Sequence, residues 1–551
     1  MAEKKLYYRF WPADVPKTIQ IPKRSLDKNL QDSAKNYPKA TAITYQDLRL
    51  SYEKLNEIAD RIANYLHSEL NVKKGDTVAL HFNNIPPCIP AYYGALRSGA
   101  RVSLLAPLFR EMEIEYQLND CEAKVFILWD GFAETDDSVI PKTKIEAAIY
   151  SSLQEWSSSI DPTSSVGLTS KYGARLYLEE IIKKTEPNPP KIEINPENDL
   201  ACLQYTGGTT GLPKGAMLTH YNLVSNVEQY RTWFHNAKIG KEVMLTALPL
   251  YHIYAQTVAM NLSVRLAANQ ILVTNAGNIQ EVLKAISQHK VTVFPGVPTL
   301  YNSILNYPDV KNYDLSSVRI CLSGGGSLPR EIQDRFEALL GAKLRDGYGL
   351  TEASPVTHVN PFSGRSKNGT IGLPLPNTDM KIIDIETGDT ILEPNKVGEL
   401  CVRGPQVMKG YFKREEETRN TIRNGWLYTG DAAMIDEEGY TIIKERLKNV
   451  IKYKGHSVYP AEVEALLLKN EAILECAVIG IPMEIDENIK AFIVLKSNFA
   501  NKVSENDIIE WSKKNMASYK YPREVQFIKE IPKTNVGKIS HLKLRDGNYK
   551  K

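Results

Sequence analysis

The spacing of apolar residues predicts helices at the start of the chain and strands soon afterwards. Within residues 26–70, apolar positions recur every three or four residues, as on one face of an amphipathic helix. Three short apolar runs follow at 77–82, 101–106 and 124–129, separated by helix-length segments. Because this alternation is typical of a parallel sheet with crossover helices, we expect an α/β fold.

The pattern breaks once and then changes along the chain. Residues 132–197 are irregular and end in a Pro-rich stretch, so we expect an insertion or surface excursion there. Strand-like runs resume at residue 198, and short strands with turn signals predict a β-rich subdomain over residues 370–445. Alternating helix and strand patterns in the remaining residues predict a compact α+β module.

These patterns predict two domains. The large N-terminal domain, residues 1–446, combines parallel α/β sheets with the β-rich subdomain. The small α+β C-terminal domain comprises residues 447–551. We place a hinge between them near residues 446–449, where the character of the sequence changes.

Charge and cysteine content narrow the class of protein. The 551 residues include 68 basic and 65 acidic side chains, a net charge of +3 that favours neither nucleic acid nor an anionic membrane as a partner. No apolar run approaches the ~18 residues of a membrane span, and the N-terminus lacks the apolar segment of a signal peptide. The six scattered cysteines are typical of reduced thiols, so we predict a cytoplasmic enzyme.

The densest run of small and hydroxyl residues is YTGGTTGLPKG, residues 205–215, which follows a strand pattern over 199–205. Successive small residues let backbone N–H groups converge on an anion, and the threonine hydroxyls add further donors. Lys214 adds a positive charge suited to phosphate. A flexible glycine linker is the simpler interpretation, but linkers rarely follow a strand so closely.

This loop differs from the P-loop of common ATPases. Pro213 stands where the second P-loop glycine belongs, and Gly215 stands where Ser or Thr would bind magnesium. Proline also lacks the N–H donor and opposes the helical turn that a P-loop requires. The sequence therefore excludes a P-loop ATPase.

The stretch YTGGTTGLPKGAMLTHYNL, residues 205–223, resembles the phosphate loop of the adenylate-forming superfamily, and its double glycine is similar to that of fatty acyl-CoA synthetases. Further motifs of that superfamily follow in order and, with the loop, span most of residues 26–545. They are LSGGGSLP (322–329), DGYGLTE (346–352), WLYTGD (426–431), ERLKNVIKYKGHSVYPAEVE (445–464) and PKTNVGKI (532–539).

The resemblance implies a nucleotide site with ATP, Mg²⁺ and coenzyme A as cofactors and co-substrates. The phosphates would contact Thr206, Gly207, Gly208, Thr209, Thr210, Gly211, Lys214 and Thr351. The adenine would lie against Gly324, Gly325, Asp346, Gly347, Tyr348 and Gly349, with the Tyr348 ring stacked on it. Glu352 would bind the metal, since a carboxylate is a hard oxygen ligand that suits Mg²⁺.

The C-terminal motifs imply the remaining roles. Asp431 would accept hydrogen bonds from the ribose hydroxyls, and Arg446 would contact ribose or phosphate. Lys448 would be the pivot of a mobile C-terminal domain that carries the catalytic lysine, Lys538. Lys454 and Gly455 would contact the pantetheine arm of coenzyme A, where glycine permits close approach. Two hinge residues, Glu445 and Asn449, depart from the usual family pattern.

The acid pocket is expected along ALPLYHIYAQT, residues 247–257, and PGVPTLY, residues 295–301. The resemblance places His252 near the reacting carboxylate, so the expected catalytic set is Lys538, Thr206, Glu352 and His252. The lining is apolar and lacks the aspartate of amino-acid-activating domains, which favours a fatty or other apolar acid. The resemblance to fatty acyl-CoA synthetases implies a medium- or long-chain fatty acid.

The leading interpretation is an AMP-forming carboxylic acid–CoA ligase. Alternatives are activation of another apolar, aromatic or hydroxy acid, loading of a carrier-protein thiol, a luciferase-type monooxygenase, or a non-catalytic nucleotide-binding regulator. The absence of a carrier segment argues against carrier loading. The chain ends in NYKK and not in S-K-L, which argues against the monooxygenase. The full set of site residues argues against the regulator. A homodimer stays open.

Overall fold

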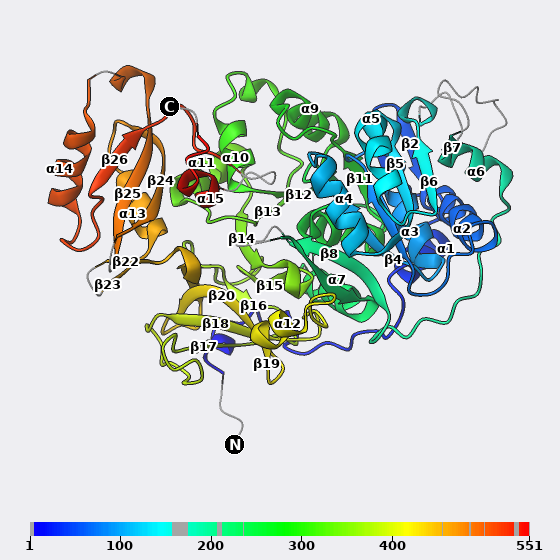
Figure 1. Cartoon of the computed structure of the whole chain (residues 1–551), viewed down its shortest axis with the longest axis horizontal. Coiled ribbons are helices and arrows are strands. Elements are labelled where there is room, and N and C mark those ends of the chain that lie inside the picture. Colours follow the sequence, from blue (N-terminus) through cyan, green and yellow to red (C-terminus); the bar gives the residue numbers. More distant parts are fainter. Residues whose placement is uncertain are drawn as a thin grey trace. The chain divides into compact units, whose positions relative to one another are not determined.

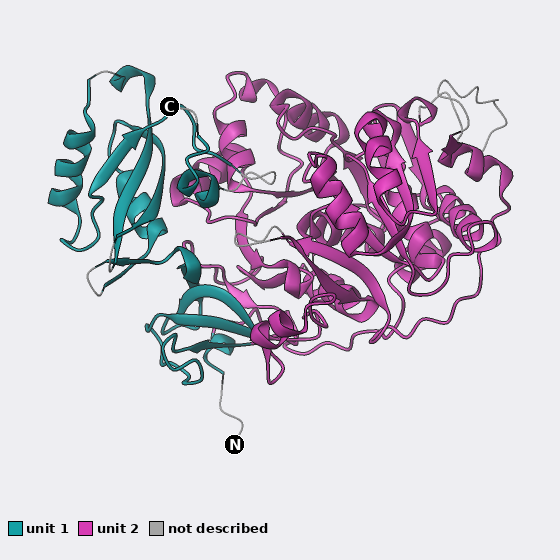
Figure 2. Ribbon diagram, viewed as in Figure 1, with its two compact units in different colours: residues 1–9, 380–402, 428–551 teal, residues 10–379, 403–427 magenta. Residues whose placement is uncertain are grey.

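The computed structural model describes residues 5–156, 175–206, 212–234, 236–453, 456–483, 486–500, 502–533 and 539–549. The chain divides into two compact units, shown in Figure 2. Unit 1 comprises residues 1–9, 380–402 and 428–551, and unit 2 comprises residues 10–379 and 403–427. The predicted domain boundary at 446/447 lies within unit 1 and stays a prediction.

A seven-stranded sheet forms the first half of unit 2, in the order β7-β6-β5-β3-β4-β8-β9 (Figure 1). All neighbouring strands are parallel except β8 and β9. Strand β3 is buried throughout, which explains its nearly continuous apolar sequence TVALH. The strands are β3 (Thr77–His81), β4 (Arg101–Leu105), β5 (Ala123–Trp129), β6 (Ala147–Ser151), β7 (Leu176–Tyr177), β8 (Leu200–Thr206) and β9 (Lys214–Thr219).

The expectation of a surface excursion over residues 132–197 is wrong for much of that segment. Strand β6 extends the parallel sheet beside β5, and β7 pairs with β6 in turn. Two short helices, α5 (Ala133–Val139) and α6 (Leu178–Lys184), accompany them and bury apolar side chains. The strands escaped detection because β6 and β7 are only 5 and 2 residues long and are flanked by polar residues.

A nine-stranded sheet forms the second half of unit 2, in the order β16-β15-β14-β13-β12-β10-β11-β1-β2. Strands β11, β10, β12, β13 and β14 are parallel, and the apolar runs after residue 198 predicted β10, β11 and β12 among them. The strands are β1 (Thr41–Tyr45), β2 (Leu48–Ser51), β10 (Val243–Thr246), β11 (Asn269–Leu272), β12 (Val293–Gly296), β13 (Ile320–Ser323), β14 (Leu344–Gly349), β15 (Val356–Val359) and β16 (Leu373–Pro374).

Helices cover both sheets of unit 2. The side chains of Phe294, Tyr301 and Phe336 join β12 to two of these helices in one apolar core. The predicted amphipathic helices within residues 26–70 are confirmed as α1 and α2, whereas residues 41–51 between them form strands β1 and β2. The helices are α1 (Lys28–Asn36), α2 (Tyr52–Ser68), α3 (Cys88–Arg97), α4 (Glu111–Asp120), α7 (His220–Trp233), α8 (Leu262–Arg265), α9 (Ile279–His289), α10 (Pro298–Leu305), α11 (Arg330–Leu340) and α12 (Glu415–Thr421).

The predicted β-rich region and α+β module each form their own sheet. The first has five strands in the order β17-β18-β20-β19, with β21 paired to β20. The second has three strands in the order β24-β25-β26, packed with helix α13. The elements are β17 (Asp379–Ile383), β18 (Gly398–Arg403), β19 (Ile422–Arg423), β20 (Trp426–Ile435), β21 (Thr441–Arg446), β22 (Ile451–Tyr453), β23 (His456–Val458), α13 (Pro460–Leu467), β24 (Ile473–Pro482), β25 (Glu487–Leu495), α14 (Glu505–Asn515), β26 (Glu524–Phe527) and α15 (His541–Arg545).

Two sequence expectations about the whole chain can be compared with these elements. All six cysteines (Cys88, Cys121, Cys202, Cys321, Cys401 and Cys476) are buried thiols. Among the helices of the described residues, none has the length and hydropathy needed to cross a bilayer.

One carboxylic acid is buried at the edge of the seven-stranded sheet. Glu179 of α6 is fully buried, and its Oε1 accepts hydrogen bonds from the hydroxyl of Ser151 and from Nε1 of Trp156 at 2.6 Å. Burial raises the pKa of Glu179 from 4.5 to about 7, because the charged form loses its hydration. The native state therefore holds a proton that the unfolded chain releases between pH 4.5 and 7.

We expect Glu179→Gln to make the chain relatively more stable in alkaline solution. The pKa of this carboxyl group is higher in the folded state than in the unfolded state. Its contribution to the free energy of unfolding is therefore lost as pH rises through about 7, by up to roughly 3 kcal/mol. Melting temperatures of variant and wild type should be close at pH 5 and separate at pH 8, with the variant higher. Glu180→Gln, which removes the surface partner of Lys184, is the control. Equal pH dependence in Glu179→Gln and wild type would contradict the assignment.

Candidate active site

The predicted phosphate loop connects two antiparallel strands. Thr206 at the end of β8 pairs with Lys214 at the start of β9, and Tyr205 pairs with Gly215. The loop glycines and threonines, residues 207–211, lie outside the described residues. A P-loop leads from a strand into a helix, whereas this loop leads from a strand into a strand. The geometry thus agrees with the exclusion of a P-loop from the sequence.

Side chains from distant segments fix the base of this hairpin. The hydroxyl of Tyr205 donates to Oδ2 of Asp120 at 2.6 Å, and Arg414 donates to Oδ1 of the same carboxylate at 2.9 Å. The hydroxyl of Tyr116 donates to the carbonyl of Pro213 at 2.7 Å. A Cβ at Gly215 would lie 3.3 Å from the Tyr205 ring, so glycine allows the ring to pack against the strand.

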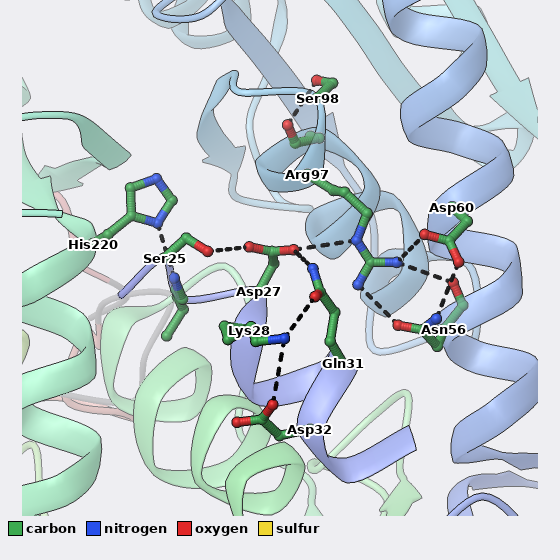
Figure 3. Close-up of polar contacts among 12 residues, drawn as sticks. Ser25, Asp27, Lys28, Gln31, Asp32, Asn56, Asp60, Arg97, Ser98 and His220 are labelled. Atoms are coloured by element: carbon green, nitrogen blue, oxygen red, sulfur yellow. Dashed lines mark hydrogen bonds and ion pairs between the residues drawn. The ribbon is translucent and has the colours of Figure 1, made fainter. Parts of the chain in front are cut away.

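The far end of the hairpin is tied to a buried polar network (Figure 3). His220 begins α7 directly after β9, and its Nδ1 accepts a hydrogen bond from the backbone N–H of Leu26 at 3.0 Å. The next residue, Asp27, accepts from Nε of Arg97 at 3.2 Å, and Arg97 also donates to Asp60 at 2.6 Å. Burial lowers the pKa of His220 to about 4, so its imidazole is neutral and Nδ1 acts as an acceptor at neutral pH.

Lys214 and Glu352 are brought together by Tyr411. The Lys214 ammonium lies 5.4 Å from the centroid of the Tyr411 ring and 3.7 Å from a carboxylate oxygen of Glu417. The Tyr411 hydroxyl donates to Oε1 of Glu352 at 2.6 Å. Thr351 precedes Glu352 in the same short 3₁₀ turn. The predicted phosphate cation and metal ligand are therefore near neighbours in space.

The predicted adenine residues lie at the carboxyl ends of adjacent parallel strands. Gly296, Ser323 and Asp346 are in register across β12, β13 and β14, so the residues that follow them share one edge of the sheet. Ligands of open α/β sheets commonly bind at this edge. Gly324 lies there, and a Cβ at this position would be 3.1 Å from the Tyr254 ring. Gly325 follows with φ +77, a conformation that favours glycine.

The β14 motif is shaped by close backbone contact. A Cβ at Gly349 would lie 2.3 Å from the carbonyl oxygen of Pro355, so only glycine fits there. Tyr348 is half-buried and pairs with His358 of β15, with ring centroids 6.1 Å apart. The N–H of Gly347 donates to Oδ1 of Asp346 at 3.1 Å, while burial raises the pKa of Asp346 well above its usual value.

His252 lies in a segment that touches both neighbouring motifs. Its Nδ1 accepts from the backbone N–H of Tyr254 at 3.2 Å. The Tyr254 hydroxyl donates to the Leu322 carbonyl at 3.2 Å, which ties this segment to β13. Gln204 of β8 donates to the Tyr251 carbonyl at 2.8 Å, which ties it to the phosphate hairpin. A buried π-helix, Ala255–Asn261, follows, and such segments are frequent at functional sites.

The predicted ribose residues form their own pair within unit 1. Asp431 of β20 faces Arg446 of β21 across the sheet, and Nε of Arg446 lies 2.9 Å from Oδ1 of Asp431. The Asp431 side chain is 3% exposed, whereas that of Arg446 is 43% exposed. The two hinge residues that depart from the family pattern contact each other, because the Asn449 amide donates to the Glu445 carboxylate at 3.2 Å.

The structure thus groups some predicted residues and leaves others untested. Within unit 2, Tyr411 joins Lys214 to Glu352, and Lys214 pairs with Thr206. The segment that contains His252 is hydrogen-bonded to β8 and to β13. Within unit 1 it pairs Asp431 with Arg446. The predicted residues that lie outside the described ranges are Gly207, Gly208, Thr209, Thr210, Gly211, Lys454, Gly455 and Lys538.

Sequence reasoning missed the segment around Tyr411. Tyr411, Arg414 and Glu417 contact the phosphate hairpin or Glu352, yet they lie about 200 residues after the loop in the chain. Their stretch, GYFKREEE, resembles an ordinary charged turn before a helix. No spacing rule relates it to the glycine loop, so only a three-dimensional structure reveals the contact.

Known proteins match this sequence over nearly its full length. The sequence matches the family model described as AMP-binding enzyme over residues 30–412, and the one described as AMP-binding enzyme C-terminal domain over residues 462–538. The long-chain-fatty-acid–CoA ligase of Bacillus subtilis strain 168 is 38% identical over 99% of this chain and 98% of that protein. The enzyme of the same name from Escherichia coli O157:H7 is 37% identical over 98% of both chains.

A solved structure extends the comparison to the fold. ATP-bound MatB from Rhodopseudomonas palustris superimposes with a TM-score of 0.85 at 26% identity, over 96% of this chain and 99% of that one. Agreement in sequence and in fold covers both the nucleotide half and the C-terminal half. The chain therefore belongs to the AMP-binding enzyme family.

Proposed function

We propose that this chain is an AMP-forming fatty acid–CoA ligase. One observation carries the proposal: Thr206 and Lys214, which flank the predicted phosphate loop, pair with each other, and Tyr411 contacts both Lys214 and Glu352. Such a set of groups suits a triphosphate with its metal ion. The names of relatives that match along the whole length support the ligase reaction and a long-chain acid.

The first half-reaction activates the acid. A carboxylate is a poor electrophile at neutral pH, since its charge repels nucleophiles and oxide is a poor leaving group. Attack of the carboxylate oxygen on the α-phosphorus of ATP forms the acyl-adenylate, and the bond to pyrophosphate breaks. The phosphate charges need electrostatic stabilisation more than covalent help. Lys214 and the donors of the 206–211 loop supply this stabilisation, and Lys538 joins them from the mobile domain.

Magnesium suits the Glu352 site only together with the nucleotide. Across the parts of the chain that the structure describes, no group of three acidic, histidine or cysteine side chains could hold a metal. Mg²⁺ typically binds one or two carboxylates and completes its shell with phosphate and water, so a single Glu352 fits this pattern. When bound, the ion would neutralise part of the phosphate charge during adenylation.

The acid would lie along the His252 segment. Apolar and aromatic side chains dominate there, and burial raises the pKa of Tyr251 to about 12, so its phenol stays neutral. The Tyr254 ring packs against Gly324 at the predicted adenine edge, and this contact supports a position of the segment between nucleotide and acid. An apolar wall without an acidic partner for an ammonium group favours a fatty acid over an amino acid.

The second half-reaction transfers the acyl group to coenzyme A. The thiol sulfur attacks the acyl carbon, a C–S bond forms, and AMP leaves with the C–O electrons. We assign the pantetheine contact to Lys454 and Gly455 and the hinge to Lys448, on the family resemblance. A cytoplasmic location is supported by the six buried thiols, since reducing compartments preserve them.

We expect acid-dependent exchange of isotope between pyrophosphate and ATP. A panel of acids from C4 to C18 should show the highest rate with a medium or long chain, because the lining is apolar. Coenzyme A should then convert the adenylate to thioester and release AMP. Hydrolysis of ATP to ADP, or no exchange with any acid, would refute the ligase assignment.

We expect Lys538→Ala to separate the two half-reactions. The variant should lose adenylation by roughly a hundredfold or more, because it lacks a charge that acts on the phosphates. It should still convert supplied acyl-adenylate and coenzyme A to thioester at nearly the wild-type rate. Equal losses in both half-reactions would show that Lys538 does not act in adenylation alone.

We expect Asp431→Asn to weaken ATP binding by about tenfold, since it replaces a charged acceptor of the ribose hydroxyls with a neutral one. The matched control is 2′,3′-dideoxy-ATP, which lacks those hydroxyls. Wild type should bind this analogue more weakly than ATP, and the variant should bind the two equally. A variant that still prefers ATP would place the ribose elsewhere.

A further inference from the structure

We propose that Tyr411 is a positioning residue for adenylation, whose hydroxyl orients the metal-binding carboxylate of Glu352 and whose ring orients the Lys214 ammonium. The proposal rests on the function proposed above, because that function gives Glu352 and Lys214 their roles toward metal and phosphate. It adds a residue that contacts both groups and that is separated from each of them in sequence.

The contacts of Tyr411 are close and partly buried. Tyr411 is 9% exposed, and its hydroxyl lies 2.6 Å from Oε1 of Glu352. Hydrogen bonds from a hydroxyl to an ionised carboxylate have this length and are stronger than neutral ones. The Lys214 ammonium lies 5.4 Å from the ring centroid, within the range of a cation–π contact.

The backbone around Tyr411 is hydrogen-bonded to β9, with an isolated antiparallel bridge between Ala216 and Tyr411. The N–H of Phe412 donates to the Gly215 carbonyl at 2.8 Å, and the N–H of Met217 donates to the Gly410 carbonyl at 2.8 Å. The N–H of Lys409 returns a bond to the Met217 carbonyl at 2.9 Å. These hydrogen bonds fix the position of the Tyr411 backbone along β9 of the phosphate hairpin.

Further contacts fix the same segment on its other side. The N–H of Met408 donates to the Glu352 carbonyl at 2.8 Å, so the segment holds both the backbone and the side chain of that residue. The N–H of Tyr411 donates to the Thr418 hydroxyl at 2.9 Å. Gly410 has φ +144, and a Cβ there would lie 2.6 Å from Cγ2 of Thr418, so glycine permits this close turn.

This arrangement has two consequences for the reaction. Tyr411 donates to Oε1 of Glu352, which restrains the carboxylate rotamer and would leave Oε2 for a metal ion. Partners of this kind orient metal ligands, and their loss typically lowers metal affinity by about 10- to 100-fold. The ring also gives the Lys214 cation a neutral neighbour on one side, while the partly exposed Glu417 carboxylate lies 3.7 Å away.

Two substitutions separate the roles of hydroxyl and ring. Tyr411→Phe keeps the ring and removes the hydroxyl, whereas Tyr411→Leu removes both. We would measure the Kd of Mn²⁺ by electron paramagnetic resonance with ATP present, the Kd of ATP in EDTA, and the Mg²⁺ dependence of pyrophosphate exchange. Tyr52→Phe is the control, because it removes a buried hydroxyl that donates to the Ala268 carbonyl at 2.7 Å, in the helical layer of α2.

For Tyr411→Phe we expect the Kd of Mn²⁺ to rise about tenfold while the Kd of metal-free ATP is unchanged. Tyr411→Leu should in addition weaken metal-free ATP binding several-fold, because Lys214 loses its ring contact. Tyr52→Phe should lower the melting temperature without changing either constant. Excess Mg²⁺ should restore the exchange rate of Tyr411→Phe.

The proposal is overturned if Tyr411→Phe binds Mn²⁺ like wild type, or if its exchange rate falls equally at all Mg²⁺ concentrations. Thermal unfolding of each variant checks folding, so a destabilised variant is judged at a temperature where it is native. If wild type binds Mn²⁺ and ATP but shows no acid-dependent exchange, the ligase function fails, while the Mn²⁺ constants still decide the role of Tyr411.

Discussion

The hydrogen-bond ladder on both sides of β9 is the constraint on which the nucleotide site depends. One side of β9 pairs with β8, and the segment 408–412 pairs with the other. A glycine-rich loop has many accessible conformations, and ordering it costs about 1–2 kcal/mol per residue. Fixing both ends of the loop by strand pairing reduces the freedom that remains to be lost when the nucleotide binds. Preorganisation here comes from backbone pairing outside the loop.

Three carboxylates in or beside the predicted motifs, two in unit 2 and one in unit 1, each have a partner that sets their orientation. Asp120 receives Tyr205 and Arg414, Glu352 receives Tyr411, and Asp431 faces Arg446. Carboxylates left without partners in a partly buried site would be costly, and they would also rotate freely. Phenol donors achieve orientation without neutralising the charge. This distinction explains why a tyrosine, and not a lysine, suits Glu352, the carboxylate that we propose for the metal.

The sequence was informative where periodicity or local chemistry is strong. The amphipathic helices α1 and α2, the buried strands β3 to β5 and the C-terminal α+β module follow directly from apolar spacing. The glycine-rich loop could be recognised because the residues that would bind phosphate follow one another in the sequence. The strands β6 and β7 were missed because two- and five-residue strands carry too few apolar positions to establish a period. Tyr411 was missed because its role depends on a contact between distant segments.

Two buried titratable groups of unit 2, His220 and Glu179, act in opposite directions on the pH dependence of stability. His220 anchors the hairpin to α1 as a neutral acceptor, and its pKa falls from 6.5 to about 4, so stability declines as pH drops below 6.5. Glu179 has its pKa raised from 4.5 to about 7, so stability declines as pH rises above 4.5. Between pH 4.5 and 6.5 the two slopes, each of about 1.4 kcal/mol per pH unit, oppose and cancel. Of these two groups, only His220 contributes below that range and only Glu179 above it. The nucleotide anchor is therefore sensitive to acid, whereas the edge of the seven-stranded sheet is sensitive to base.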